Sequence, residues 1–181
     1  MKPHLSTVEP PDLALHSRNI LAFLPVLLFF STLVAAQQPS SMLTVVGPAK
    51  TLTITSPDWA DLPKTTVRAT NGHDKTTSTY SGVLLRDLLH QAGVPSGEAL
   101  RGRDLAACVR LTAKDGYVAV FALGELDPSI RDEDVLVADT KDGKPLADNR
   151  GPLQLIVPAD KRPARWIRML TRVEVVNMKQ P

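Results

Sequence analysis

Three dipeptides of the kind that turns a β-hairpin divide much of this sequence into short runs: Asn71-Gly72, Asp115-Gly116 and Asp142-Gly143. Asn, Asp and Gly are favoured in such turns because they tolerate the positive φ angles that a tight turn requires. β-prone runs flank the pairs: KTTVRAT precedes the first, CVRLT and GYVAVFAL surround the second, and DVLVADT and KPL surround the third. This spacing predicts a mainly β domain in which hairpins join short strands.

Further strands and a few short helices complete the predicted architecture. LTIT (52–55) and RVEVV (172–176) alternate apolar and polar residues, whereas GPLQLIVP (151–158) is nearly continuous and apolar, as in a strand covered on both faces. An amphipathic helix is expected in SGVLLRDLLHQAGV (81–94), where one face carries Leu85, Leu88, Leu89 and Ala92. A shorter helical turn is expected at Ser56–Pro63, with Ser56 as its cap. The predicted fold class is therefore α+β, a mainly β domain with a mixed, barrel-like sheet and a few short helices.

The N-terminal part carries an uncharged apolar run, Ile20–Ala36, that ends in small residues. This pattern is typical of a secretory signal peptide. We therefore expect residues 1–36 to be the signal peptide and residues 37–181 to be a single domain with its core at about 43–177. A retained membrane anchor is the alternative, although a run of 17 residues interrupted by Pro25 is short for a bilayer span. The mature domain is expected to be periplasmic or secreted, without membrane contact after cleavage.

Composition and motifs exclude several classes of function. The net charge is +2, with both signs scattered along the chain, and no basic tract suggests nucleic-acid binding. The single cysteine, Cys108, argues against a cysteine metal cluster and is expected to be a small buried hydrophobe. The acid-rich run DPSIRDED (127–134) lacks the Gly and spaced ligands of a calcium loop, so a solvated loop is expected. The sequence contains no nucleophile elbow, HExxH motif or Gly-rich phosphate loop.

A cationic cluster follows the apolar strand that ends at Pro158. Its members surround one tryptophan, Trp166, and are Lys161, Arg162, Arg165 and Arg168. Planar Arg forks match phosphate oxygens and Lys adds a point charge, so the cluster suits a phosphate or another anion. The alternative is a solvated edge whose cations balance neighbouring Asp side chains, because exposed ion pairs are frequent and individually weak. Trp166 is expected either beneath an Arg or against the core.

Four segments together resemble the sulfite-oxidase-like molybdopterin-binding oxidoreductase domains, above all the short, exported, single-domain members of that family. The segments are YSGVLLRDLLHQAGV, LTAKDGYVAVF, VLVADTKDGKPLADNRGPLQLIVP and ARWIRMLTRVEVV, and they follow the family's order. The resemblance covers residues 52–176 and implies the sulfite-oxidase-like molybdopterin-binding fold. It also implies molybdopterin as the cofactor to consider and oxidoreductase chemistry as the activity to test.

Two departures from the family's pattern bear on function. The resemblance implies that molybdenum is held by a Cys ahead of the helix, and the corresponding stretch here, TTVRATNGHDKTTSTYSG, contains none. Gln154 also stands where the pattern has an Arg near the cofactor. A thiolate is the soft, anionic ligand that fixes this metal and tunes its potential, so the loss of the Cys affects the chemistry directly.

The resulting prediction is a binding module for a small anion, a pterin or a periplasmic partner protein. No catalytic residue, metal ligand or firm cofactor is assigned, and the residues predicted to bind the ligand are Lys161, Arg162, Arg165 and Tyr117. The alternative is an active molybdopterin-dependent oxidoreductase with a non-Cys metal site, for which His73 or Asp74 is the candidate ligand. A scaffold without any ligand is a third interpretation, and bound metal separates the first two.

Overall fold

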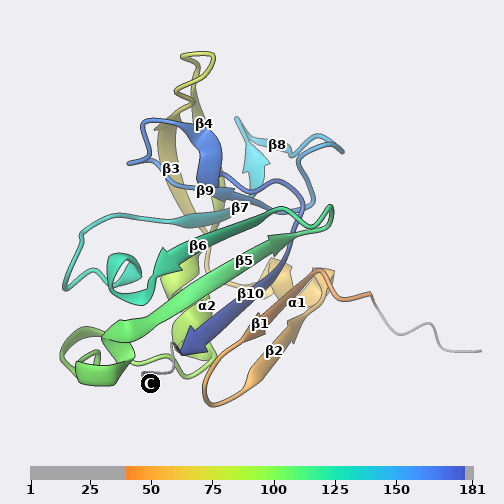
Figure 1. The fold of residues 1–181 in the computed structure, drawn as a ribbon. Helices are drawn as coiled ribbons and strands as arrows, with labels where there is room; N and C mark the ends of the chain where they lie inside the picture. The colour runs from red at the N-terminus through yellow and green to blue at the C-terminus, as the bar shows by residue number, and fades with distance from the viewer. Residues whose placement is uncertain (1–39, 178–181) are drawn as a thin grey trace, which may run out of the picture. The chain divides into compact units, whose positions relative to one another are not determined.

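The strands of the described residues, 40–177 in this computed structural model, form two sheets. Sheet A has the order β2-β1-β10-β5-β6. Its strands are β1 (Leu43–Val46), β2 (Thr51–Ile54), β5 (Ala107–Ala113), β6 (Val118–Ala122) and β10 (Leu170–Asn177). Figure 1 shows dark blue β10 between the orange β1–β2 hairpin and green β5. Because β10 pairs with β1 in parallel, the first and last strands of the described residues lie side by side.

Sheet B has the order β3-β4-β7-β8, and β9 also pairs with β7. Its strands are β3 (Thr65–Thr70), β4 (Thr77–Leu84), β7 (Leu136–Lys141), β8 (Lys144–Pro145) and β9 (Gln154–Ile156). The three predicted hairpins are present as β3–β4, β5–β6 and β7–β8. The second and third turns use the expected positive φ, at Gly116 (88°) and at Asp142 and Gly143 (50° and 75°).

The β3–β4 turn uses its glycine differently from the sequence prediction. The non-glycine residue with positive φ in this turn is Lys75 (60°), and Gly72 is not among the glycines with positive φ. A Cβ atom added at Gly72 would lie 1.9 Å from the backbone oxygen of Lys161, in the loop after β9. Glycine is therefore required here for a close approach between two backbones rather than for the turn itself.

Two α-helices and several 3-10 turns connect the strands. The helices are α1 (Ser56–Asp61) and α2 (Leu85–Gln91), and the turns are η1 (Gly97–Ala99), η2 (Gly102–Ala106), η3 (Leu123–Leu126) and η4 (Pro163–Arg165). The predicted apolar stripe of α2 is confirmed, because Leu85, Leu88, Leu89 and Ala92 are all buried.

The prediction that Ser56 caps α1 was one residue off. The N-cap is Thr55, and the Thr55 hydroxyl and backbone N–H both donate to Asp58 Oδ2, at 2.6 Å and 2.9 Å. The Asp58 backbone N–H points back to the Thr55 hydroxyl, which completes a capping box. These hydrogen bonds lower the pKa of the Asp58 carboxyl below its ordinary value.

The two sheets share one hydrophobic core. Buried residues from both sheets and from α2 belong to a single cluster, which includes Leu43, Val109, Leu136, Leu155 and Leu88. The predicted fully covered strand is buried from Leu153 to Val157, although only Gln154–Ile156 has strand geometry. The predicted mainly β, α+β fold class is confirmed.

Two sequence predictions about single segments need correction. Cys108 is a free thiol that is only half-buried on β5, not a fully buried hydrophobe. The acid-rich loop is only partly solvated, because Asp127 is buried and accepts hydrogen bonds from the Gly97 N–H (2.8 Å) and the Ser129 N–H (2.8 Å). The Ser129 and Gly97 hydrogen bonds lower the pKa of Asp127.

Among residues 40–177, no helix has the length and apolar character needed to span a bilayer. The predicted signal peptide and its alternative, a membrane anchor, both lie outside the described residues.

Candidate functional site

The cationic cluster lies in the loop between β9 and β10, and the buried Trp166 side chain packs this loop against the core. The indole N–H donates to the backbone oxygen of Val157 at 2.9 Å, and the ring is buried. Trp166 also packs edge-to-face on Tyr80, with ring centroids 5.8 Å apart and an interplanar angle of 86°. Of the two predicted environments for Trp166, the core is therefore the observed one.

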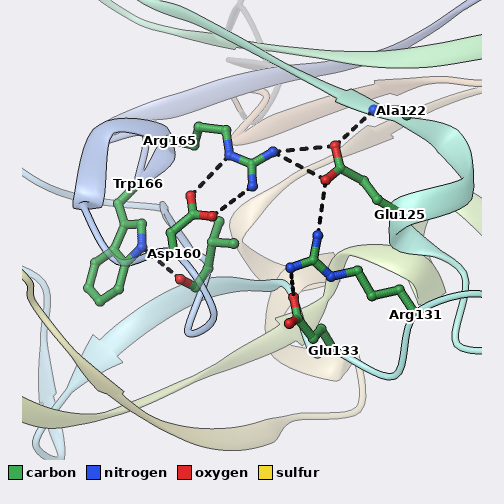
Figure 2. Close-up of polar contacts among 8 residues, drawn as sticks. Ala122, Glu125, Arg131, Glu133, Asp160, Arg165 and Trp166 are labelled. Carbon is green, nitrogen blue, oxygen red and sulfur yellow. Dashed lines mark hydrogen bonds and ion pairs between the residues drawn. The ribbon is translucent and has the colours of Figure 1, made fainter.

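Arg165 is held by two carboxylates (Figure 2). Its guanidinium donates to both oxygens of Asp160, at 2.7 Å and 3.0 Å, and Nη1 donates to the Glu125 carboxylate at 3.3 Å and 3.4 Å. The guanidinium carbon lies 4.2 Å from the ring centroid of Phe121, which gives a cation–π contact. The hydrogen bonds to Asp160, reinforced by the charge of Glu125, raise the pKa of Arg165. Its donors are therefore already used within the chain.

Glu125 connects Arg165 to a wider network of charges (Figure 2). Its carboxylate accepts the Ala122 backbone N–H at 2.9 Å and lies 3.6 Å from Arg131. Arg131 in turn pairs with Glu133 at 2.8 Å. The network ties the loop after β9 to η3 and to the acid-rich segment. The ion pair between Arg165 and Asp160 thus holds the loop in its conformation, which is a structural role.

Tyr117 acts on the same loop from the β5–β6 turn. Its hydroxyl donates to the backbone oxygen of Ala164, in η4, at 2.7 Å. The side chain is 52% exposed and lines a hollow of about 240 Å³ together with Asp115 and Arg168. Tyr117 therefore positions η4, and its ring remains accessible from solvent.

Arg162 lines a second pocket beside η4, which shares Pro163 and Ala164 with the hollow at Tyr117. This pocket has a volume of about 340 Å³, and its lining residues are Gly72, His73, Arg162, Pro163 and Ala164. The close approach of Gly72 to Lys161 brings the β3–β4 turn to this loop and so places His73 in the same pocket as Arg162. We call this pocket the η4 pocket.

The four predicted site residues thus have different surroundings. Lys161 and Arg162 are exposed, and within residues 40–177 neither has a carboxylate in ion-pair range. Arg165 is paired with Asp160 and Glu125, and neither Arg165 nor Tyr117 lines the η4 pocket. Their role as ligand-binding residues stays a prediction.

Sequence reasoning did not connect His73 with Arg162, because no spacing rule relates two residues so far apart in the chain. The sequence marks the place only by Gly72, whose close approach to Lys161 becomes visible in the structure.

Two further side chains matter for the expected cofactor. Gln154 is 1% exposed, and within the described residues its Oε1 atom has no hydrogen-bond partner. Cys108 lies opposite Ala122 in the β5–β6 register. At about 3.4 Å per residue, Ala122 is about 17 Å along β6 from Tyr117. Cys108 is therefore at the end of the hairpin away from Tyr117, and it does not line the η4 pocket.

Comparisons with known proteins identify the fold as that of a molybdopterin-binding domain. A family model described as "Oxidoreductase molybdopterin binding domain" matches residues 42–181. Among solved structures, the chain is similar to the sulfane dehydrogenase SoxCD from Paracoccus pantotrophus, with a TM-score of 0.60 and 19% sequence identity. That match covers 78% of this chain and 40% of the other, so this chain spans about two fifths of the length of that protein. No curated protein matches the chain.

Proposed function

Because this chain belongs to the family of oxidoreductase molybdopterin-binding domains, we propose that it binds an anionic ligand of the molybdopterin class in the η4 pocket. The observation that carries the proposal is the contrast between two arginines of one loop. Arg165 is paired with two carboxylates, whereas Arg162 lines the pocket and has no ion-pair partner within residues 40–177. An unpaired guanidinium offers a planar fork of donors that matches a phosphate. Lys161, next to Arg162, adds positive charge to the rim.

The residues present fit the phosphate of such a ligand better than its metal. The resemblance implies a thiolate for molybdenum, but Cys108 is not among the residues that line the η4 pocket. Within the described part of the chain, no group of three or more His, Cys, Asp and Glu side chains lies close enough to hold a metal ion. We therefore derive no redox step and propose a binding module for the pterin phosphate or another small anion.

A second candidate function, a molybdopterin-dependent oxidoreductase with a non-Cys metal site, is favoured by one observation. His73 lines the η4 pocket beside Arg162, and a neutral imidazole can ligate a transition metal. Asp74, the other residue considered, accepts hydrogen bonds from the Thr76 hydroxyl and N–H, at 2.6 Å and 3.0 Å. His73 is therefore the better candidate of the two.

We also infer that the domain acts outside the cytoplasm, as a periplasmic or secreted protein. The support is the uncharged run Ile20–Ala36, which has the length and small-residue end of a secretory signal peptide. The partners proposed for the mature domain are correspondingly a small anionic ligand or a periplasmic protein.

The test is to express the full chain in a host that makes molybdopterin, purify it, and measure pterin and molybdenum per protein. We expect retained pterin without stoichiometric molybdenum. Because a hydrogen bond to a charged group contributes about 1.5–3 kcal/mol, Arg162→Ala is expected to weaken binding by about 10- to 100-fold. Arg101→Ala is the matched control, since Arg101 is exposed, outside the η4 pocket and without an ion pair among residues 40–177.

Arg165→Ala distinguishes ligand binding from loop structure. It leaves Asp160 without its cation and Glu125 with Arg131 alone, so we expect a loss of about 1–3 kcal/mol in the free energy of unfolding. Arg162→Ala is expected to unfold like the parent protein. Equal pterin retention in the Arg162→Ala and parent proteins, or no retained pterin in a folded parent, would contradict the proposal. Stoichiometric molybdenum that is lost in His73→Ala would establish the second candidate function instead.

A further inference from the structure

A second cavity, larger than the η4 pocket, lies where α1 meets β7, β8 and the loop that follows β8. Its volume is about 560 Å³, within the range of about 300–1,000 Å³ that is typical of small-molecule sites. The lining residues are Met42, Ser56, Trp59, Asp139, Pro145, Leu146, Asp148, Gly151 and Pro152. None of them lines the η4 pocket, so the two cavities are separate sites. We call this one the α1 cavity.

One corner of the α1 cavity already binds an ammonium group of the chain itself. The Lys64 ammonium lies 3.0 Å from Asp139 Oδ2 and 4.1 Å from the centroid of the Trp59 ring. The Trp59 indole N–H donates to the same carboxylate oxygen at 2.7 Å, and the Thr140 hydroxyl donates to the other at 2.7 Å. Asp139 therefore has its charge balanced and its hydrogen-bonding capacity largely used.

The second carboxylate of the cavity is not balanced in this way. Asp148 is exposed, and among residues 40–177 it has neither a hydrogen bond nor an ion pair to its side chain. With Lys64 offsetting Asp139, the cavity retains about one negative charge, contributed by Asp148. The remaining walls are largely apolar and include Met42 and Leu146. An anion is disfavoured here, whereas a cation with an apolar body meets complementary groups.

We propose that the α1 cavity binds a small organic cation, a primary ammonium on an apolar body. The ammonium pairs with Asp148, and the apolar body lies against Met42, Leu146 and the part of the buried Trp59 side chain that lines the cavity. The Lys64 ammonium lies between the Asp139 carboxylate and the face of the Trp59 ring. The chain thus already contains one ammonium group bound by a carboxylate and an aromatic ring. This site does not depend on the function proposed for the η4 pocket.

The test uses phenethylammonium as the probe and the two tryptophan indole N–H signals of the ¹⁵N-labelled full chain as reporters. Trp59 lines the cavity. Trp166 lies outside it, where its indole N–H is hydrogen-bonded to the Val157 oxygen, and serves as an internal control. We expect a saturable shift of the Trp59 signal and none of the Trp166 signal. The neutral analogue 2-phenylethanol is expected to bind at least about tenfold more weakly, because it lacks the charge that pairs with Asp148.

A matched pair of variants identifies the carboxylate. Asp148→Asn is expected to weaken phenethylammonium binding about tenfold, whereas Asp132→Asn, at an exposed acid outside the cavity, leaves it unchanged. The proposal is overturned if Trp59 shows no saturable shift, if both indoles shift together, or if Asp148→Asn binds as tightly as the parent. Equal affinity for 2-phenylethanol would also overturn it, and that comparison requires no variant to fold.

Discussion

At the scale of single residues, the carboxylate of Asp139 is the most strongly engaged acid on sheet B. Burial raises its pKa, but hydrogen bonds from Thr140, Trp59 and Lys64 outweigh this effect and hold the pKa below the ordinary value. A carboxyl group whose pKa is lower in the folded than in the unfolded state stabilises the fold above the unfolded pKa of about 3.9. That stabilisation is lost as the pH falls through the lower, folded pKa.

Asp139→Asn is therefore expected to lower the free energy of unfolding by about 1–3 kcal/mol at pH 7, because the amide loses the charge that Lys64 and Trp59 bind. The difference from the parent should shrink as the pH falls below about 3.9, because the unfolded parent then binds a proton that the folded parent binds only at a lower pH. Urea denaturation at pH 7 and pH 3 measures both values, with Asp132→Asn as a control at an exposed acid. A difference that stays constant between these pH values would refute the argument.

At the candidate site, the residue types could be predicted from the sequence, but their ion-pair partners could not. The cationic cluster was identified from its composition, and its role as a ligand-binding site stays a prediction. Which arginine is paired was not predictable, because Glu125 reaches Arg165 through tertiary structure and no local pattern relates the two residues. Asp160 was closer in sequence, but an acid five residues away in a loop has no fixed geometry until the loop folds.

At the scale of elements, the N-cap of α1 can be tested by comparing two neighbouring residues, the observed cap Thr55 and the predicted cap Ser56. Thr55 makes the capping box with Asp58, whereas the Ser56 hydroxyl reaches only the Met42 sulfur, at 3.9 Å. Thr55→Ala is expected to cost about 0.5–2 kcal/mol of unfolding free energy, the usual range for a lost N-cap. Ser56→Ala is expected to cost less than Thr55→Ala. Thermal or urea denaturation compares the two, and an equal loss in both would show that the cap was misassigned.

Elements whose signals are local were predicted well, and the exceptions have tertiary causes. The hairpins and the buried stripe of α2 follow from turn chemistry and periodicity, which act over a few residues. The β3–β4 turn differs because its glycine serves contact with Lys161, from a loop that the local sequence does not reveal. The covered strand Gln154–Ile156 is short because the flanking buried residues pair outside its ladder with β7. The Leu153 oxygen accepts the Leu170 N–H at 2.9 Å, and the Val157 oxygen accepts the Asp160 N–H at 3.0 Å.

At the scale of the whole molecule, the shared core predicts a single unfolding event for the domain. Both sheets contribute to one hydrophobic cluster, so neither is expected to persist when the other is lost. A chain beginning at Gln37 should unfold in one transition, with a midpoint within a few degrees of the full chain. Far-ultraviolet circular dichroism and tryptophan fluorescence should give coincident curves, since Trp59 and Trp166 report on different parts of the core. Two separated transitions would contradict this expectation.

The pairing of β10 with both β1 and β5 has a consequence for how the molecule is made. Among the strands of residues 40–177, β10 alone connects the β1–β2 hairpin to the β5–β6 hairpin in sheet A. Synthesis proceeds from the N-terminus, so residues 170–177 are the last of these strands to leave the ribosome. Until then the two hairpins have no common neighbour, and chaperones can bind them as separate segments. Sheet A can therefore be completed only after residues 170–177 have been made, whatever the order in which the hairpins form.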